Sequence, residues 1–396
     1  MAFSAWQIVL ISSVVIGLVS FSVLHFKQPK SGMLLLKDSV CVKAAVNARH
    51  SKLHSSFTLD FNDILTIRAQ NTKKYAYPYN LNGVDKRSNL SQKEFLDVYD
   101  GKWPVIITDV VPSWPATNWT TQYFLQNYGE EQVVMKATTG KRIETLALPL
   151  RSYLSHITES SPASWTYLQD ELFLLQRPEL RRQILKSVYT ESNLFDLFPP
   201  AVQPWDCMLL WGTAYSRSTL HIDPYNWTGT NAVIFGHKKW KLIPPGQDKF
   251  LSISPDQVCG FPLDCQKYNS HIDAFNPSED EKKLLQKVNI LEVEQGPGEM
   301  LFIPTGWFHQ AYNVVPTLAV SGQLMNENNY LSVLEEILKG GSVRRQQLPQ
   351  DVAQMSSYDL VKAVMSSLSE EVLRRGAQVT RDTLDQMAFN RDPLEK

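Results

Sequence analysis

A histidine and an aspartate, His221 and Asp223, stand two residues apart in the segment STLHIDPYNWTGTNAVIFGHKKW, which covers residues 218–240. The start of this segment has the composition of a strand, and side chains two apart in a strand leave on the same face. A neutral imidazole and a carboxylate held side by side can occupy two positions on one face of a metal ion. The pattern therefore predicts two ligands of a metal site.

A third ligand has to come from another strand, and the segment GEMLFIPTGWFHQAYNV, residues 298–314, offers His309. Its glycines and proline predict turns on either side of a short strand, which makes His309 an early residue of the next strand. Two histidines and one carboxylate leave three adjacent positions open, which suits non-haem Fe(II) activating dioxygen, whereas catalytic zinc usually keeps one. A lone strand histidine more often has a structural role, so it is the combination that favours a metal centre.

A lysine on the next expected strand, Lys238, indicates where the electrons for such chemistry come from. Dioxygen activation at Fe(II) needs two more electrons than iron and substrate readily supply, and a 2-oxoacid supplies them by decarboxylating. If this co-substrate chelates iron through its 2-oxo and C1 carboxylate oxygens, its far carboxylate ends inside the barrel and needs a cation there. We expect Lys238 to be that cation and the adjacent Lys239 to be an exposed strand lysine.

The elements that must position these residues are mainly strands. Short β-branched and aromatic runs separated by Gly and Pro extend from about residue 206 to 323, the pattern of a double-sheet antiparallel barrel. Helical patterns flank them at 119–129, 148–158, 178–189 and 358–376. The predicted fold class is mainly β with flanking helices, a double-stranded β-helix of the jelly-roll or cupin-like kind. Its expected strands are 207–211, 219–222, 231–235, 239–243, 290–293, 300–303, 308–313 and 317–324.

The chain divides into four expected parts: an anchor and its flank at 1–30, a connector at 31–88, the barrel domain at 89–335 with its core at about 206–323, and a helical segment at 336–396. An apolar stripe runs along one face of the last helix. We interpret it as intramolecular packing, and the alternative is the seam of a homodimer. The stripe consists of Leu360, Val364, Leu368 and Val372.

The N-terminal segment has no acidic or basic residue before Lys27 and is long enough to cross roughly 30 Å of hydrocarbon as a helix. We expect residues 6–26 to be a transmembrane helix; a cleaved signal peptide competes, but a basic n-region and a clear cleavage site are missing. The expected localisation is therefore that of a single-pass membrane protein, in an endomembrane such as the endoplasmic reticulum. Flanking lysines favour a cytosolic body, although the side of the membrane stays open.

Charge and cysteine usage exclude several other classes of protein. The net charge is −1 and the basic pairs are scattered, so direct nucleic-acid binding is not expected. Four cysteines are too few and too irregularly spaced for a disulfide framework or a zinc ribbon. Cys259 and Cys265 share one polar segment and either form a disulfide in an oxidising compartment or remain two thiols.

Together, these motifs resemble those of the Jumonji C (JmjC) family of Fe(II)- and 2-oxoglutarate-dependent oxygenases. The resemblance is carried by HIDPYNWTGTNAVIFGHKKWKLIPPG and GEMLFIPTGWFHQAYNVVPTLAVSGQ, with the upstream segment KWPVIITDVVPSWPATNWT, and it runs from about Ser91 to Gln323. It is strongest toward the subgroup of small arginine demethylases and lysyl hydroxylases of the phosphatidylserine-receptor type. The JmjC barrel is itself a double-stranded β-helix, in agreement with the expected strands.

Position by position, the resemblance implies roles for eight side chains. His221, Asp223 and His309 match the iron triad, which is also the catalytic set. Lys238 matches the lysine that pairs with the distal carboxylate of 2-oxoglutarate. The resemblance implies further contacts with the co-substrate at Asn231, Ser321, Ser218 and Tyr167.

The activity that the resemblance implies is an oxygenase that uses Fe(II), 2-oxoglutarate and dioxygen to hydroxylate a protein side chain. Where the hydroxylated carbon bears a methylated nitrogen, the product would be the demethylated amine. Two alternatives remain, a non-catalytic cupin-like binding or scaffold module and a small-molecule or RNA-base hydroxylase of the same fold. The complete triad with its lysine favours an enzyme over a binding module, whereas barrel motifs do not encode the substrate.

Overall fold

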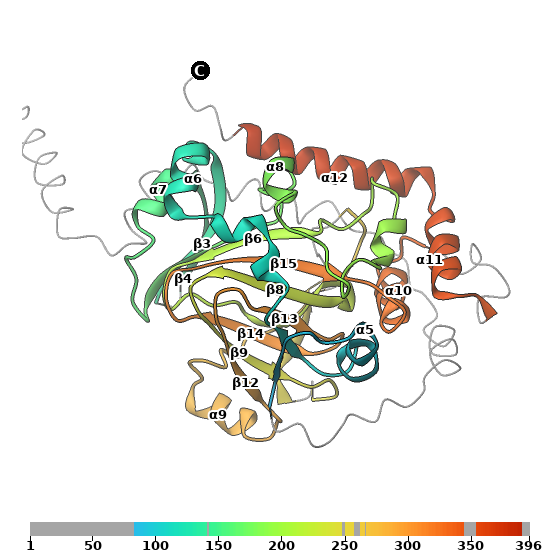
Figure 1. The fold of residues 1–396 in the computed structure, drawn as a ribbon, viewed down its shortest axis with the longest axis horizontal. Coiled ribbons are helices and arrows are strands. Elements are labelled where there is room, and N and C mark those ends of the chain that lie inside the picture. Colours follow the sequence, from blue (N-terminus) through green and yellow to red (C-terminus); the bar gives the residue numbers. More distant parts are fainter. Residues whose placement is uncertain are drawn as a thin grey trace, which may run out of the picture.

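Two β-sheets packed face to face form the body of the protein in the computed structural model, which describes residues 83–389 except 141, 248–249, 257–261, 266 and 344–353 (Figure 1). Within these residues the larger sheet consists, in spatial order, of β1 (Asp85–Arg87), β2 (Val105–Ile107), β13 (Met300–Ile303), β8 (Thr228–Phe235), β15 (Thr317–Leu324), β6 (Cys207–Gly212), β5 (Ser164–Asp170), β3 (Gln132–Thr139) and β4 (Arg142–Pro149). The smaller sheet consists of β10 (Ile253–Asp256), β11 (Lys267–Ser270), β7 (Leu220–Ile222), β14 (Phe308–Asn313), β9 (Lys238–Ile243) and β12 (Leu291–Gln295).

The predicted fold class, mainly β with flanking helices in a cupin-like barrel, is confirmed. Each expected barrel strand has a counterpart, and β13, β14 and β15 have the predicted bounds. The sequence analysis missed β3, β4 and β5, which extend the larger sheet past β6. Their hairpin carries charged residues on its exposed side, so its hydrophobic alternation is weaker than that of the barrel strands.

Helices precede, interrupt and follow the strands along the described residues. They are α5 (Gln92–Glu94), α6 (Thr121–Tyr128), α7 (Leu150–Ser155), α8 (Pro178–Arg181), α9 (Glu279–Leu285), α10 (Tyr330–Lys339), α11 (Ser357–Ser366) and α12 (Glu370–Phe389). Short π or 3-10 turns are η1 (Phe95–Tyr99), η2 (Val111–Ser113), η3 (Pro115–Asn118), η4 (Leu194–Leu197) and η5 (Pro224–Asn226).

Two helix predictions need correction. The helix expected over 178–189 ends at Arg181, because the next N–H groups, those of Gln183 and Ile184, donate to carbonyls three residues back and form turns instead. Further on, the Thr190 hydroxyl accepts a hydrogen bond from the backbone N–H of Ser187 at 2.9 Å. The helix expected over 358–376 is two helices, α11 and α12. The break follows from Ser369, whose hydroxyl accepts from the Val372 N–H at 3.3 Å and caps the start of α12.

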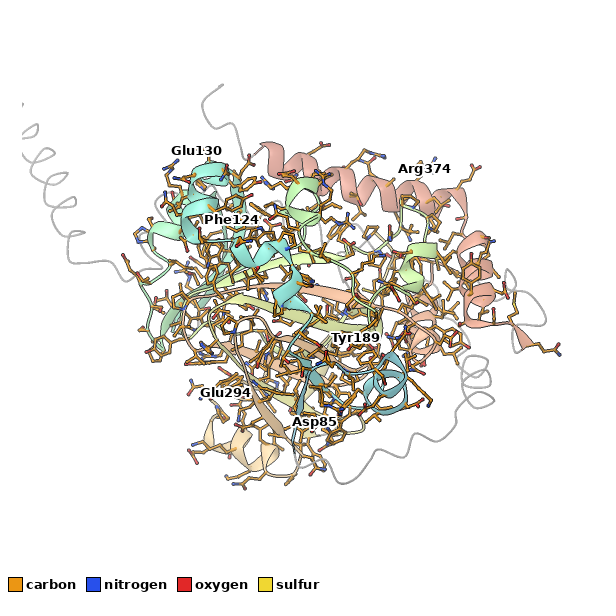
Figure 2. All side chains as sticks on the ribbon, viewed as in Figure 1. Asp85, Phe124, Glu130, Tyr189, Glu294 and Arg374 are labelled. Carbon is orange, nitrogen blue, oxygen red and sulfur yellow. The ribbon has the colours of Figure 1, made fainter. Side chains whose placement is uncertain are left out.

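The main hydrophobic core joins side chains of the larger sheet and of the N-terminal helices with several from the smaller sheet. Phe124 of α6, labelled in Figure 2, is fully buried, and its ring meets that of Trp211 of β6 at 5.2 Å between centroids. Aromatic pairs of this edge-on kind add to the free energy gained from burial. This packing braces β6, and β6 in turn holds β15 and β5 in register around the interior of the barrel.

The C-terminal stripe is covered within the single chain. Leu360, Val364 and Leu368 are buried and Val372 packs against the same cluster, which includes Trp227 directly before β8. These side chains therefore do not need a second copy of the chain to exclude water from them, and intramolecular packing accounts for the stripe. Helix α12 runs along one edge of the molecule (Figure 1).

Gly376 of α12 should not tolerate a side chain, although alanine is the better helix former. A Cβ at this position would lie 2.4 Å from the backbone oxygen of Ala201 and 2.8 Å from a methyl group of Val202. We expect Gly376→Ala to lower the free energy of unfolding by roughly 1–2 kcal/mol, since the clash exceeds the gain of about 1 kcal/mol in helix propensity. Urea unfolding measures it. Arg374→Ala, on the outward side of α12 in Figure 2, is the matched control, and equal stability of both variants would contradict the prediction.

The expected membrane localisation requires correction. None of the helices in the described ranges is long and apolar enough to cross a bilayer. The single-pass membrane assignment, with its endoplasmic reticulum location, is overturned by this finding; the segment 6–26 on which it was based lies outside the described residues.

Cys265 is disulfide-bonded, whereas Cys259, its expected partner, lies outside the described residues. Cys207 is a buried free thiol whose pKa is raised by burial.

Candidate metal centre

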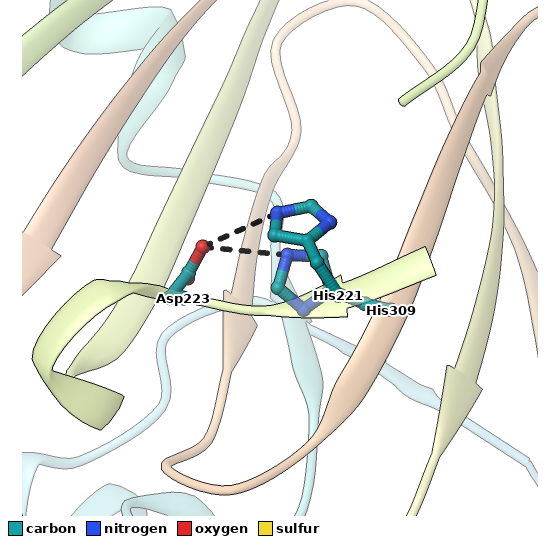
Figure 3. Close-up of side chains that lie close together, drawn as sticks. All are labelled: His221, Asp223 and His309. Carbon is teal, nitrogen blue, oxygen red and sulfur yellow. Dashed lines mark ion pairs between the residues drawn. The ribbon is translucent and has the colours of Figure 1, made fainter. Parts of the chain in front are cut away.

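Strand register brings the two histidines together. His221 of β7 and His309 of β14 are directly opposite each other in the ladder, and their ring centroids are 4.3 Å apart. Asp223 follows β7 directly with an extended backbone (φ −61°, ψ 148°), so its side chain leaves on the same face as that of His221. Figure 3 shows both imidazoles on one side of the Asp223 carboxylate.

The spacing of the three side chains fits one metal ion. The Oδ1 atom of Asp223 is 3.7 Å from Nε2 of His221 and 3.5 Å from Nε2 of His309. One ligand atom from each residue lies within 4.8 Å of the others. Ligands about 2.1 Å from a common ion in adjacent octahedral positions are about 3 Å apart, so small side-chain rotations suffice for coordination. All three ligands come from one side, which leaves the opposite side for other groups.

Backbone carbonyls select the tautomer of each histidine. The Nδ1 atom of His221 is 2.8 Å from the carbonyl oxygen of Thr219, and Nδ1 of His309 is 3.2 Å from that of Trp307. Because a carbonyl can only accept a hydrogen bond, each Nδ1 must carry the proton and donate it. The lone pair is then on Nε2, the atom that faces Asp223, as a metal ligand requires.

The protonation states of the three side chains depend on one another. Burial would raise the pKa of Asp223, but the two imidazoles outweigh it and hold that pKa far below its usual range. Burial and the neighbouring His309 lower the pKa of His221, which favours its neutral form. Burial also disfavours a charged His309, but Asp223 outweighs it and raises the pKa of that ring. A fixed anion beside two imidazoles is a suitable donor set for a divalent cation.

Gly229 of β8 supports the carboxylate from behind. A Cβ on this residue would lie 2.1 Å from Oδ2 of Asp223, so the carboxylate occupies the space that a side chain would take. The chain reaches this position through a left-handed turn at Tyr225 and Asn226 (φ 53° and 55°). This turn reverses the chain between β7 and β8, so that Gly229 of β8 lies against the Asp223 carboxylate.

We expect Gly229→Ala to weaken iron binding by roughly 10- to 100-fold, because the added methyl group displaces the Asp223 carboxylate, as loss of a ligand-orienting contact does in other metal sites. Calorimetric titration with Fe(II) under argon measures this effect. The matched control is Gly296→Ala, whose Cβ would meet nothing closer than an atom of His237 at 3.6 Å. Equal iron affinity of the two variants would refute the supporting role of Gly229.

A cavity of about 320 Å³ between the two sheets contains the metal-binding face. The sequence-predicted residues that line it together with the triad are Ser218, Asn231, Ser321 and Tyr167. They come from four separate segments that the barrel brings to one interior. Lys238 is not in the cavity wall itself but lies behind it, with 1% of its surface exposed.

Lys238 is connected to the cavity wall by a hydrogen bond to Tyr167. Its ammonium donates to the Tyr167 hydroxyl at 3.1 Å, and none of the carboxylates in the described residues forms an ion pair with it. Burial lowers the pKa of Lys238 to about 7 and raises that of Tyr167. The adjacent Lys239 is half exposed and pairs with Glu294 at 3.0 Å, as expected for an outward strand lysine.

Two of the remaining predicted residues differ in their hydrogen bonding. The hydroxyl of Ser218 accepts from the Ala311 N–H at 3.0 Å, so it is engaged in pairing the strand that carries His309. Asn231 is buried and its Oδ1 atom has no hydrogen-bond partner within the protein. A buried polar atom without a partner beside a cavity indicates a place for a polar ligand.

Trp240 was missed by the sequence analysis. Its ring lies 5.8 Å from the Lys238 ammonium and 6.1 Å from the His309 ring, so it separates the lysine from the metal side. Its indole N–H donates to the Gln295 side chain at 2.8 Å, which fixes the ring in the cavity wall. The alternation of strand side chains could have identified it, because residues 238 and 240 share a face.

Comparison with known proteins places this architecture in a family. A family model described as a cupin-like domain matches residues 91–323. The chain belongs to the cupin-like domain family. The resemblance to JmjC oxygenases is also confirmed, since relatives of this cupin-like protein carry names of that kind.

Three relatives illustrate the similarity. The cupin-like protein is 26% identical over 269 residues to the bifunctional arginine demethylase and lysyl-hydroxylase psr-1 of Caenorhabditis elegans, covering 64% of this chain and 63% of that one. It is 28% identical over 214 residues to the 2-oxoglutarate and iron-dependent oxygenase JMJD4 of Danio rerio, covering 50% and 47%. Lysine-specific demethylase JMJ21 of Arabidopsis thaliana is 25% identical over 277 residues, covering 68% and 28%. The chain thus spans less than two thirds of the length of each.

Proposed function

We propose that this cupin-like protein is an Fe(II)- and 2-oxoglutarate-dependent dioxygenase that hydroxylates a side chain of a protein substrate, or demethylates it through hydroxylation. The observation that carries the proposal is the convergence of His221, Asp223 and His309 on one face of a cavity. The names of its relatives, which include iron- and 2-oxoglutarate-dependent oxygenases, demethylases and a lysyl-hydroxylase, support it.

Iron(II) and 2-oxoglutarate, when bound, supply the oxidation of a C–H bond by dioxygen, with succinate and carbon dioxide as co-products. In this proposal the Nε2 atoms of His221 and His309 and a carboxylate oxygen of Asp223 hold the metal. The backbone carbonyls that accept from each Nδ1 keep both rings oriented before the metal arrives. The protein thereby avoids the cost of ordering its ligands at each binding event.

Lys238, Tyr167 and Asn231 are proposed to hold the co-substrate, with Ser321 and Ser218 in the same cavity wall. The buried ammonium and the Tyr167 hydroxyl can each donate to a carboxylate at the closed end of the cavity. A carboxylate there would restore the charge of Lys238, whose pKa burial alone lowers to about 7. The Oδ1 atom of Asn231 is an acceptor and so cannot bind a carboxylate, whereas its amide nitrogen can donate.

Apolar side chains separate the polar groups of the cavity. Leu210, Trp240, Ile303 and Ala311 are among the residues that line it. These walls limit the water that reaches the metal and strengthen the electrostatic interactions of the bound co-substrate. We propose residues 89–335 as the oxygenase unit, with 336–396 as a helical addition and 1–30 and 31–88 as the preceding segments.

The test is anaerobic reconstitution of the full chain with Fe(II), followed by titration with 2-oxoglutarate. We expect a weak visible metal-to-ligand charge-transfer band and, once air is admitted, slow succinate formation without any substrate. Folded, iron-loaded protein that gives neither signal would refute the proposal in favour of a binding module.

A further inference from the structure

Strand β4 is the last strand of the larger sheet, and among the described strands only β3 pairs with it. Figure 1 shows β3 and β4 at one margin of this sheet. A terminal strand presents backbone N–H and C=O groups that its own ladder does not use, which makes it a template for pairing with another chain. The edge of β4 is therefore a surface where an extended polypeptide can add to the sheet.

The hairpin between β3 and β4 determines which backbone groups of β4 face outward. Thr139 and Arg142 flank a two-residue loop and are ladder partners, so they form the hydrogen-bonded kind of pair. Pairs of this kind alternate with pairs that share no hydrogen bond, and Ile143 with Thr138 is of the second kind. The N–H and C=O groups of Ile143, and by the same alternation those of Thr145, therefore point away from β3.

The same two residues face the cavity side of the sheet. Thr145 lines the cavity, and so does Lys136, its ladder partner on β3. Side chains two apart on a strand share a face, so Ile143 lies on the cavity side next to this lining. Leu146 and Leu148 fall on the opposite face and belong to the main hydrophobic core. One short stretch of β4 thus combines outward backbone groups with a face that continues into the cavity.

Ile143 is unusually exposed for a large apolar side chain. With 61% of its surface accessible, it is the most exposed side chain of this kind in the described residues. Arg142 and Glu144 leave on the opposite face of the strand, where they form an ion pair with each other. The tip of the hairpin is open as well, since a Cβ on Gly140 would meet no described atom within 4 Å. An apolar group of a partner chain can therefore reach Ile143 without displacing these side chains.

We propose that the open edge of β4 binds an extended segment of the polypeptide substrate as an added strand, with Ile143 in contact with an apolar residue of that segment. Main-chain hydrogen bonds then supply affinity, and the contact with Ile143 supplies selectivity. The added strand passes Thr145 at the cavity, so a residue further along the same polypeptide can enter toward the metal. This inference rests on the proposed function, because it assigns how the substrate of the same cavity is held.

A substrate segment fits this edge better than a second copy of the chain. The accessible part of β4 is short, because residues 146–148 are buried and leave only Ile143 and Thr145 with accessible outward groups. Two such residues offer roughly four main-chain hydrogen bonds, whereas stable interfaces bury roughly 1,200–2,000 Å² in total. Transient binding of a substrate needs no such area, and Thr145 makes the edge continuous with the proposed substrate cavity.

Hydrogen exchange of the full chain tests whether the edge is open. By mass spectrometry with residue resolution, we expect the amides of Ile143 and Thr145 to exchange at least about tenfold faster than that of Glu144, whose N–H lies in the ladder with β3. Slow exchange of the first two amides in dilute protein without any peptide would show that the edge is already paired, and would overturn the inference.

The binding test uses dodecapeptides selected from a random displayed library on the full chain loaded with Mn(II) and 2-oxoglutarate. We expect the selected peptides to slow the exchange of the Ile143 and Thr145 amides. Methylation of alternate backbone nitrogens of a selected peptide should weaken its binding by about tenfold or more, because these nitrogens donate to β4, whereas methylation of the intervening ones should have a smaller effect.

Variants of Ile143 separate the backbone contribution from that of the side chain. Ile143→Pro removes an outward N–H without breaking the ladder with β3 and should weaken peptide binding by about tenfold. Ile143→Thr keeps the backbone groups and should weaken binding by about threefold, through loss of apolar contact. The matched control, Leu185→Thr, replaces another exposed apolar side chain outside the cavity lining and should keep the affinity of the unaltered chain.

The contrary outcomes are distinct. Equal binding of the selected peptides by Ile143→Pro and the unaltered chain would overturn the inference, as would a library that yields no peptide protecting the edge. Protection that appears without peptide and grows with protein concentration would assign the edge to a second copy of the chain instead. Failure of the proposed function is seen separately, as absence of succinate from the iron-loaded chain while a peptide still protects the edge.

Discussion

Asp223→Ala should abolish succinate formation and weaken iron binding by more than about 100-fold. The carboxylate is the only anion among the three described groups that converge on the metal face, and the two imidazoles hold its pKa far below the usual range, which favours its charged form. Its loss leaves two neutral imidazoles, and we expect this to cost more than the loss of a hydrogen bond that orients a metal ligand, which typically lowers affinity by about 10- to 100-fold. Coupled measurement of succinate and calorimetric iron titration together check the expectation.

The matched controls separate loss of the metal from loss of the fold. His221→Ala should behave like Asp223→Ala, whereas His237→Ala should retain both iron and turnover, since His237 lies outside the cavity lining. Circular dichroism and thermal unfolding establish that each variant is folded. Retained succinate formation by a folded Asp223→Ala variant would contradict the assignment of the metal centre.

The sequence predicts much of this site because its pattern is local. His221 and Asp223 share a face through strand alternation alone, and this needs no knowledge of the tertiary structure. The expected strands around them are equally local, since β-branched runs between Gly and Pro residues define them. The structure brings these residues to one cavity, and the roles that the resemblance implies for them remain predictions.

What the sequence could not predict depends on register between distant strands. The proximity of Gly229 to Oδ2 of Asp223 follows from a left-handed turn at Tyr225 and Asn226, and although asparagine tolerates this conformation, tyrosine rarely adopts it. Lys136 and Lys267 are far apart in the sequence, and both line the cavity because the two sheets pack together. The long helix expected over 358–376 was wrong at its centre, because a serine cap outweighed the helical periodicity there.

Lys238→Ala should raise the KM for 2-oxoglutarate by about 100-fold or more. The ammonium is 1% exposed and bonded to the Tyr167 hydroxyl, so its removal would leave the far carboxylate of the co-substrate buried without a cation. Breaking a buried ion pair in this way costs about 3–5 kcal/mol, which corresponds to at least 100-fold in affinity. Lys239→Ala is the matched control, because that neighbouring lysine points outward to Glu294.

The same lysine makes 2-oxoglutarate binding depend on pH. Burial lowers its pKa to about 7 in the free protein, so the ammonium that binds the carboxylate is increasingly deprotonated as the pH rises above 7. The apparent Kd for 2-oxoglutarate should therefore increase, approaching tenfold per pH unit, between about pH 7.5 and 9. Lys238→Arg should bind more weakly at pH 7 but lose this dependence, since a guanidinium stays charged throughout. Anaerobic titrations with Mn(II) in place of iron measure both curves, and a Kd that does not change with pH in the unaltered chain would exclude Lys238 as the carboxylate partner.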